Sequence, residues 1–144
     1  METAPDDVAE LAAQLRPALL RLGRMIRNQR VDFSLTLGQL SALYTIEKSG
    51  PLSPRQIASL ERVQPPSMTK ILASLEELDF IRREPHPTDG RQALIAVTPK
   101  GEEYLQIERT ARDRWLNRRL AMLEPAERAI LMSAAPLIDK LAEI

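Results

Sequence analysis

The chain has 144 residues, of which 44% are hydrophobic and 28% are charged, a composition typical of one folded domain and not of a disordered tail. It has no cysteine and one histidine, His86. Disulfides, thiolate metal sites and cysteine nucleophiles are therefore excluded, and neither a metal site nor a cofactor is expected. The 20 basic and 20 acidic side chains balance, whereas an indiscriminate nucleic-acid binder carries a basic excess.

A membrane or secreted protein is not expected either. The sequence has no apolar run of about 18 residues, the length that indicates a transmembrane helix. Its first residues are acidic, whereas a signal peptide begins with a basic segment followed by an apolar one. We therefore expect a soluble, cytoplasmic protein.

The first two predicted elements are helices. Apolar residues recur at helical spacing over residues 6–30 and predict one long amphipathic helix. Thr36 stands three residues before Gln39, which is the spacing of a capping box and predicts the start of a second helix. The Ser-Gly-Pro sequence at residues 49–51 ends that helix.

Two shorter helices follow. Ser53 precedes Pro54 and lies three residues before Gln56, a combination typical of a helix start. This third helix ends near Arg62, and a fourth over residues 65–79 begins with two prolines, which are tolerated in the first turn. Its predicted buried face carries Met68, Ile71, Leu72, Leu75 and Leu78, and its other face carries Pro66, Thr69, Lys70, Ala73, Ser74 and Glu77.

The helical pattern then gives way to a predicted β-hairpin. Residues 80–84 and 92–97 favour strands, and the intervening residues 85–91 contain two prolines and an Asp-Gly pair. Thr98-Pro99 begins another helix that runs to about residue 123. A last helix starts at Pro125, and we expect Pro136 to bend or split it.

Three short helices followed by a hairpin have the order of a winged helix-turn-helix. We therefore predict a mainly α fold with a small β-hairpin wing, in which residues 36–98 form a DNA-binding lobe. Residues 1–35 and 99–144 form a helical dimerisation lobe of the same compact domain, because their apolar stripes exceed what the winged lobe alone can cover. A two-fold homodimer would bury them, and the alternative is a monomer in which these helices close a single core.

The fourth helix has the properties of a recognition helix. The major groove admits one helix if its outer face is small and polar, and Ser67, Thr69, Lys70 and Ser74 give this helix such a face. Its N-terminus, with unpaired backbone N–H groups, would also favour a phosphate. The alternative is that this face is only the solvated side of a packed helix.

The hairpin carries a second set of candidate contacts. Arg91 at the tip would extend into a narrow minor groove, where negative potential attracts arginine, and Asp89 would hold its guanidinium. Arg82 and Arg83 at the base would contact backbone phosphates. The alternative is that Asp89 and Arg91 only stabilise a solvated turn.

From Ser53 to Gly101 the sequence resembles the MarR family of winged-helix transcription regulators. The resemblance rests on Leu-Ser-Pro-Arg-Gln-Ile-Ala-Ser-Leu at 52–60 and Pro-Ser-Met-Thr-Lys-Ile-Leu-Ala-Ser-Leu-Glu at 66–76. It extends to Ile-Arg-Arg at 81–83, Pro-Thr-Asp-Gly-Arg at 87–91 and Val-Thr-Pro-Lys-Gly at 97–101. The family pattern of helices covers essentially the whole chain.

This resemblance implies a homodimer that binds double-stranded DNA at a palindromic operator, and in most members represses transcription. It places recognition-helix contacts at Gln64, Pro66, Ser67, Thr69, Lys70 and Ser74. It places wing contacts at Asp89 and Arg91, and phosphate contacts at Ser53 and Arg55. The recognition helix carries no arginine to read guanine, so shape readout through Arg91 gains importance.

Many members of the family release DNA when a phenolic or aromatic acid binds. The absence of cysteine excludes a peroxide-sensing thiol, and His86 between two prolines is expected to be a solvated wing residue and not a zinc ligand. Arginines of the first helix would pair with an organic acid or with neighbouring carboxylates. The sequence does not assign the ligand-binding residues.

Two other classes of function were weighed. An enzyme is not expected, because the sequence offers no catalytic constellation of nucleophile, acid and base and no glycine-rich phosphate loop. A winged-helix protein-interaction module without DNA binding is the alternative, because residues 36–98 carry seven basic and seven acidic side chains. The dependence of duplex binding on salt concentration discriminates between the two readings.

Overall fold

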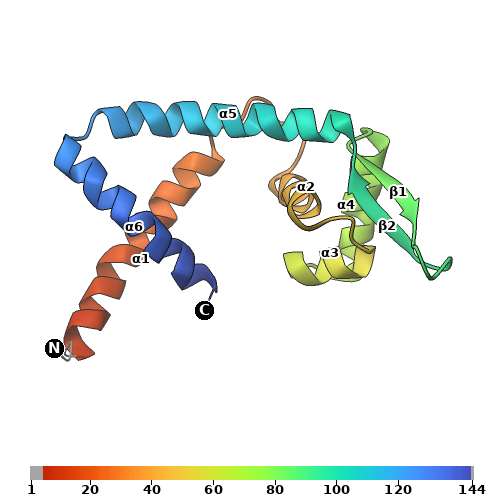
Figure 1. Ribbon diagram of the computed structural model, residues 1–144, viewed down its shortest axis with the longest axis horizontal. Helices are drawn as coiled ribbons and strands as arrows, with labels where there is room; N and C mark the ends of the chain where they lie inside the picture. The colour runs from red at the N-terminus through yellow and green to blue at the C-terminus, as the bar shows by residue number, and fades with distance from the viewer. Residues whose placement is uncertain (1–4, 144) are drawn as a thin grey trace. The chain divides into compact units, whose positions relative to one another are not determined.

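A computed structural model describes residues 5–143 of the chain. These residues form six helices and one two-stranded antiparallel hairpin (Figure 1), so the predicted fold class is confirmed. The elements are α1 (Pro5–Arg27), α2 (Leu37–Ser49), α3 (Pro54–Glu61), α4 (Pro65–Glu77), β1 (Ile81–Pro85), β2 (Ala93–Val97), α5 (Pro99–Ala121) and α6 (Pro125–Glu143).

The chain divides into two compact units. The winged unit comprises residues 30–109, and the helical unit comprises the described residues up to 29 together with those from 110 onward. Helix α5 begins in the winged unit and ends in the helical unit. Each unit is described below by itself.

Local capping interactions begin α2 and α3 where the sequence predicts them. The Thr36 hydroxyl accepts a hydrogen bond from the Gln39 N–H (3.1 Å), and the Gln39 side chain accepts one from the Thr36 N–H (2.9 Å). Ser53 and Gln56 form the same reciprocal pair at the start of α3 (3.2 and 2.9 Å). Both predicted capping boxes are confirmed, and they fix the start of α3 to within a residue.

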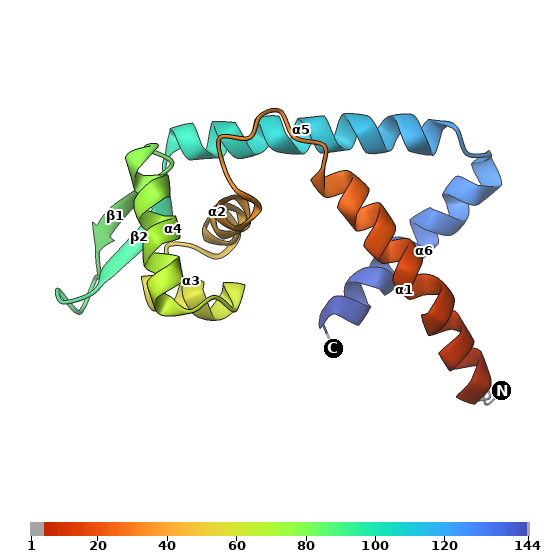
Figure 2. The same ribbon diagram turned by 180° about the vertical axis from the view of Figure 1, so that it is seen from behind.

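The winged unit closes around one apolar core to which α2, α3, α4, the hairpin and the start of α5 all contribute. Figure 2 shows α2, α3, α4 and the hairpin gathered together. Of the residues predicted to line the inner face of α4, Met68, Leu72 and Leu75 are buried, and the two others pack against the core. Leu52, just before α3, pairs with Ile95 of β2 through two backbone hydrogen bonds of 2.7 and 3.1 Å. This pairing joins the entry to α3 directly to the hairpin.

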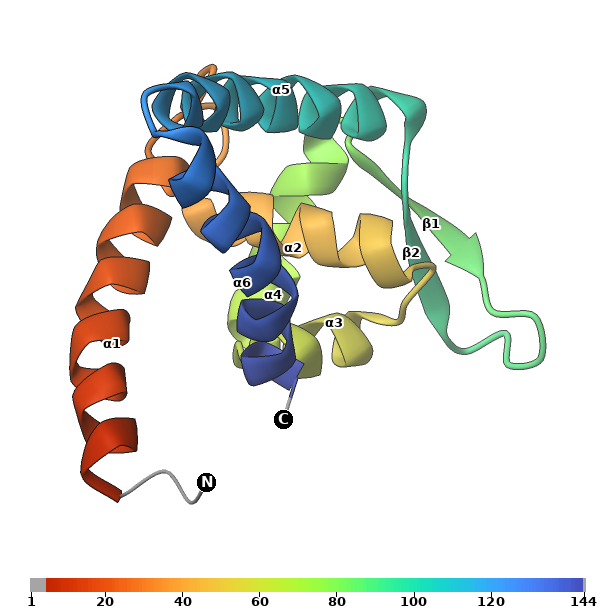
Figure 3. The ribbon, with the colours of Figure 1, turned by 60° about the vertical axis from the view of Figure 1, so that its left-hand side comes forward.

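The hairpin pairs Ile81 with Val97 at one end and Pro85 with Ala93 at the other. Figure 3 shows the loop between the two strands projecting beyond the helices of the winged unit. At the opposite end, the Thr98 hydroxyl donates to the Asp79 carbonyl oxygen (2.6 Å) and accepts from the Gly101 N–H (3.1 Å). Gly101 is required there, because a Cβ would collide with the Phe80 carbonyl oxygen.

The segment that enters α2 is held against α5 by a polar contact within the winged unit. The Tyr104 hydroxyl donates to a carboxylate oxygen of Asp32 (3.0 Å). Partial burial raises the pKa of Tyr104, and the hydrogen bond from the Ser34 hydroxyl lowers the pKa of Asp32. At neutral pH the contact therefore joins a neutral phenol to a carboxylate.

The helical unit buries little of its apolar surface. Within it, Trp115 of α5 is buried, but no residue of α6 is. Large apolar side chains of α1 and α6 are exposed: Val8, Leu11, Leu20, Leu22, Met25, Ile130, Leu131, Met132, Leu137, Ile138 and Leu141. The unit thus presents two helices whose apolar faces lack a covering layer.

Pro136 does not split α6, contrary to one of the two outcomes predicted from the sequence. The helix continues as one element from Pro125 to Glu143. Proline at this position removes the hydrogen bond to the carbonyl of Met132, four residues earlier. The loss of this one hydrogen bond does not end the helix, and Met132 itself is 78% exposed.

Candidate nucleic-acid interface

The outer face of α4 is small, polar and exposed, as the sequence predicts. Pro66, Ser67, Thr69, Lys70 and Ala73 are exposed, whereas Ser74 is half-buried. The Thr69 hydroxyl donates to the Pro65 carbonyl oxygen (3.0 Å), and the Ser74 hydroxyl donates to the Lys70 carbonyl oxygen (3.1 Å). The oxygens of these two hydroxyls remain available as acceptors, and Lys70 supplies the one cation on this face.

The start of α4 is a weaker anion site than its sequence predicts. Pro65 and Pro66 occupy its first two helical positions, and proline has no backbone N–H. The Met68 N–H is already bonded to the Gln64 carbonyl oxygen (3.0 Å). Only the Ser67 N–H is left in the first turn, so the outer side chains of α4 matter more than its N-terminus.

A hollow between the start of α3 and the hairpin brings together four of the predicted contact residues. This wing hollow has a volume of about 410 Å³ and is lined by Ser53, Pro54, Arg55, Arg83, Arg91, Gln92 and Ala93. Three of its lining residues are arginines and none is acidic. The sequence places these arginines 8 to 36 residues apart, and the Leu52–Ile95 pairing brings their segments together.

A second hollow lies beside the first, along the turn between α3 and α4. This turn hollow, of about 440 Å³, is lined by Arg55, Ala58, Ser59, Arg62, Val63, Gln64 and Pro65. Arg55 lines both hollows, so the two are adjacent. Gln64 is a predicted contact residue. Arg62 is not, because its one signal in the sequence is its position at the expected end of α3.

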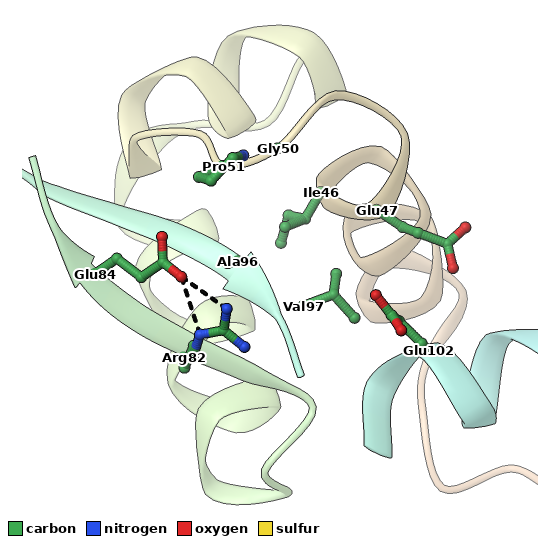
Figure 4. Close-up of a pocket in the computed structure, with 9 residues that line it drawn as sticks. All are labelled: Ile46, Glu47, Gly50, Pro51, Arg82, Glu84, Ala96, Val97 and Glu102. Carbon is green, nitrogen blue, oxygen red and sulfur yellow. Dashed lines mark hydrogen bonds and ion pairs between the residues drawn. The ribbon is translucent and has the colours of Figure 1, made fainter. Parts of the chain in front are cut away.

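Arg82 lies elsewhere. Neighbouring residues of a strand point to opposite faces. Arg83 lines the wing hollow, whereas Arg82 lines a third hollow with Glu47, Glu84 and Glu102 (Figure 4). Its guanidinium donates to a Glu84 carboxylate oxygen from two nitrogens, at 2.8 and 3.0 Å. The structure does not bring Arg82 together with the other predicted contacts.

These hollows show that the winged unit separates positive from negative side chains, although the net charge of residues 36–98 is zero. The wing and turn hollows are lined by four arginines and no acid, whereas the acidic hollow of Figure 4 is lined by three glutamates and one arginine. Arg83 is partly compensated, because its Nε lies 3.0 Å from a carboxylate oxygen of Glu76. A balanced total charge is therefore compatible with a cationic face.

The wing loop is organised by side chains that accept from its backbone. One carboxylate oxygen of Asp89 accepts from the Arg91 N–H (3.0 Å), and the structure gives no ion pair between the two side chains among the described residues. Asp89 thus fixes the backbone that carries Arg91. This differs from the prediction, in which Asp89 holds the Arg91 guanidinium.

His86 differs from its prediction as a solvated wing residue. It is half-buried, and its Nδ1 accepts from the N–H groups of Thr88 (3.2 Å) and Asp89 (3.0 Å). These bonds require an unprotonated Nδ1. His86 and Asp89 together hold the loop from which the Arg91 side chain, exposed to solvent, extends.

Comparisons with known proteins agree with this architecture. The model of the MarR family matches residues 35–93. An uncharacterised HTH-type transcriptional regulator of Mycobacterium bovis is 45% identical over 138 residues, which cover 96% of each chain. The chain belongs to the MarR family. The match spans nearly the full length of the relative, so both units are shared with it.

Solved structures lead to the same family fold. A crystal structure of a transcriptional regulator from Pseudomonas aeruginosa has a TM-score of 0.87 and 28% identity, and the match covers 98% of this chain and 99% of the other. The FabT protein of Streptococcus pneumoniae, solved in complex with DNA, has a TM-score of 0.65 at 16% identity over 97% and 98% of the two chains. Like its relatives, this MarR-family protein is a transcriptional regulator and not an enzyme.

The described residues can be compared with the prediction that the chain has no transmembrane helix. Among residues 5–143, no helix combines the length and apolar character needed to cross a bilayer. The same residues contain no group of three or more acidic or histidine side chains arranged to hold a metal ion.

Proposed function

We propose that this MarR-family regulator is a homodimer that binds a palindromic operator and represses transcription. One observation carries the proposal. Helix α6 has six large apolar side chains, yet all six are exposed and the helix has no buried residue. An isolated chain would leave these faces in water at a cost of about 25 cal/mol per Å² of apolar surface. A second copy of the same helices would cover them.

Two-fold symmetry also suits the DNA. A dimer presents two α4 helices to successive major grooves, about 34 Å apart along the duplex. A palindromic site then offers each α4 helix the same half-site. In this arrangement residues 1–35 and 99–144 act as the dimerisation lobe, and residues 36–98 act as the DNA-binding lobe.

The proposed contacts follow from the two arginine-lined hollows and the outer face of α4. Ser67, Thr69, Lys70 and Ser74, with Gln64 and Pro66 at the helix start, face the major groove. Ser53, Arg55 and Arg83 contact phosphates, because their side chains line the wing hollow. Arg91 enters the minor groove from a loop that Asp89 holds, and Arg82 has no part in this interface.

We further propose that an aromatic or phenolic acid releases the protein from DNA. A hollow within the helical unit, lined by Ala18, Arg21, Leu22, Met25, Trp115 and Arg119, supports this proposal. Its apolar side chains suit an aromatic ring, and two guanidinium groups suit a carboxylate. The Arg119 guanidinium lies 5.1 Å from the centre of the Trp115 ring.

One experiment tests DNA binding and symmetry together. The purified protein selects duplexes from a random library at 50 and 200 mM salt, and sedimentation equilibrium gives its mass. We expect enrichment of a palindrome with half-sites about one helical turn apart, steep loss of binding at the higher salt, and a mass of twice 16.2 kDa. A stable monomer at micromolar concentration excludes the dimer, and no enrichment at either salt favours the protein-interaction module.

Titration with 4-hydroxybenzoate tests the effector proposal separately. We expect micromolar to millimolar concentrations to release the selected duplex, and an Arg21→Gln, Arg119→Gln double variant to need a higher concentration because the carboxylate loses both cations. Isothermal titration measures binding directly. If 4-hydroxybenzoate and benzoate neither bind nor release DNA, aromatic-acid regulation through this hollow is refuted, while the DNA-binding proposal is unaffected.

A further inference from the structure

Arg62 has a backbone conformation that arginine rarely adopts. It is the C-cap of α3, with φ 53° and ψ 43°, in the left-handed region. For a residue with a Cβ this region is unfavourable, and helix ends of this kind usually carry glycine or asparagine. An unfavourable residue at such a position calls for a reason in its side chain.

The side chain of Arg62 is exposed, and no described residue forms a hydrogen bond or an ion pair with it. Its neighbour Glu61 does not compensate its charge, because the Glu61 carboxylate accepts from the Ser41 hydroxyl (2.8 Å) and from the Thr45 hydroxyl, both on α2. The Glu61 carboxylate is thus engaged with α2, and the positive charge of Arg62 remains exposed at the turn.

The position of Arg62 continues the cationic surface of the winged unit. Arg62 lines the turn hollow together with Arg55, and Arg55 lines the wing hollow together with Arg83 and Arg91. None of the residues that line the two hollows is acidic. The turn hollow also includes Gln64, the residue that precedes the outer face of α4.

We propose that Arg62 binds a phosphate of the duplex DNA backbone next to the major groove that α4 enters. This inference rests on the proposed DNA binding and adds a contact that the family motif does not include. A planar guanidinium binds phosphate oxygens through two parallel N–H groups. Arg62 and Arg55 line the same hollow as Gln64 and Pro65, so two phosphate contacts would lie beside the start of α4.

Two variants of Arg62 test the proposal in the full-length protein, with the selected operator as the probe. Arg62→Asn removes the charge but suits the left-handed backbone, so we expect an unchanged or higher melting temperature. Its operator affinity falls about tenfold to a hundredfold, because each dimer loses two charged hydrogen-bonding groups. The slope of log affinity against log salt becomes shallower by about 1.8, or about 0.9 per lost phosphate contact.

Arg62→Lys keeps the charge but loses the planar fork. We expect its salt slope to match that of the unmodified protein and its affinity to fall only about threefold. Arg82→Gln is the matched control, because it removes one arginine charge from the winged unit at the acidic hollow. We expect it to leave the salt slope unchanged.

The outcomes separate the inference from the proposed function. If the unmodified protein binds no duplex at any salt concentration, the DNA-binding proposal fails and takes this inference with it. If it binds and Arg62→Asn has the same affinity and salt slope, the Arg62 contact is refuted while DNA binding stands. A fall in both affinity and melting temperature for Arg62→Asn would mean a structural role for Arg62 and would also refute the contact.

Discussion

The winged unit and the helical unit use similar apolar side chains in opposite ways. In the winged unit, Leu43, Leu75 and Ile95 are all fully buried in one core. In α6 of the helical unit, Leu137 and Met132 are 63% and 78% exposed. One unit completes its core within the chain, whereas the other presents its apolar faces at the surface.

This difference separates two contributions to stability. Substitutions in the core of the winged unit change the free energy of unfolding of the chain itself, at any protein concentration. Substitutions on the apolar faces of the helical unit, under the proposed dimer, change association and so depend on protein concentration. The following predictions test this division, from the largest expected effect to the smallest.

Truncating a core side chain of the winged unit has the largest expected effect. Leu75→Ala leaves a cavity in a fully buried position, so we expect the free energy of unfolding to fall by about 2–5 kcal/mol. Urea unfolding followed by circular dichroism measures the loss. Leu60→Ala is the control, because Leu60 of α3 is 58% exposed, and we expect a change within about 0.5 kcal/mol. Equal losses for the two variants would contradict the described core.

Charges on the apolar face of α6 are expected to break association while the winged unit stays folded. Ile130 and Leu137 are seven residues apart and so lie on one face of the helix. In the Ile130→Arg, Leu137→Arg double variant we expect the dimer dissociation constant to rise at least about 100-fold, since each buried side chain contributes about 1.5–3 kcal/mol. Sedimentation equilibrium over a range of concentrations measures it.

Asp139→Arg supplies the control for that variant. Asp139 is exposed and lies on the opposite side of α6 from Leu137 at 100° per residue. It introduces an arginine on the side of α6 away from Ile130 and Leu137. A dimer that tolerates the double variant as well as it tolerates this control would place the interface elsewhere.

Two neighbouring arginines of β1 test which face of the winged unit binds DNA. Arg83 lines the wing hollow and Arg82 lines the acidic hollow, so removal of their charges has unequal effects on DNA binding. We expect Arg83→Gln to weaken operator binding about tenfold, because the dimer loses two charge-assisted contacts, and Arg82→Gln to change it less than about twofold. Fluorescence anisotropy at fixed salt measures both, and equal effects would argue against the assigned face.

The smallest expected effect concerns pH and the Asp32–Tyr104 contact. Burial raises the pKa of Tyr104, so its contribution to stability is complete below pH 10 and is lost as pH rises towards the folded-state pKa. We expect Tyr104→Phe to lose less stability than the unmodified chain between pH 9 and pH 11, by under about 1 kcal/mol because solvent screens the group. Urea unfolding at both pH values tests this, and parallel losses would contradict it.

The pKa of Asp32 acts at the other end of the pH range. The hydrogen bond from the Ser34 hydroxyl lowers this pKa below its ordinary value of 3.8. Its contribution to stability is therefore present above pH 3.8 and is lost as pH falls through the folded-state pKa. Both residues lie in the winged unit, so neither change is expected to depend on protein concentration.

Much of the fold follows from short-range patterns in the sequence. The capping pairs Thr36–Gln39 and Ser53–Gln56 involve residues three apart, so local geometry alone fixes these helix starts. The inner face of α4 follows from helical spacing for the same reason. The effect of Pro136 was harder to predict, because a proline inside a helix can either kink it or break it.

The candidate site could be predicted only in part. Ser53, Arg55, Arg83 and Arg91 were identified from motif and position, but their common location depends on the pairing of Leu52 with Ile95, which are distant in sequence. Strand alternation indicates that Arg82 and Arg83 face opposite ways without telling which of them faces α3. Arg62 could have been found only as a basic residue at the expected end of a helix.

The sequence by itself therefore determined the order of the elements, most of their boundaries and the motifs that identify the family, because these depend on interactions between near neighbours along the chain. The tertiary structure decided where the charges gather. Seven basic and seven acidic side chains in residues 36–98 cancel in any count along the chain. Long-range packing brings four of these arginines to two hollows that no acidic residue lines, and it places Glu47 and Glu84 at a third hollow. The electrostatic potential follows this arrangement, because it depends on distance in space and not on separation in sequence.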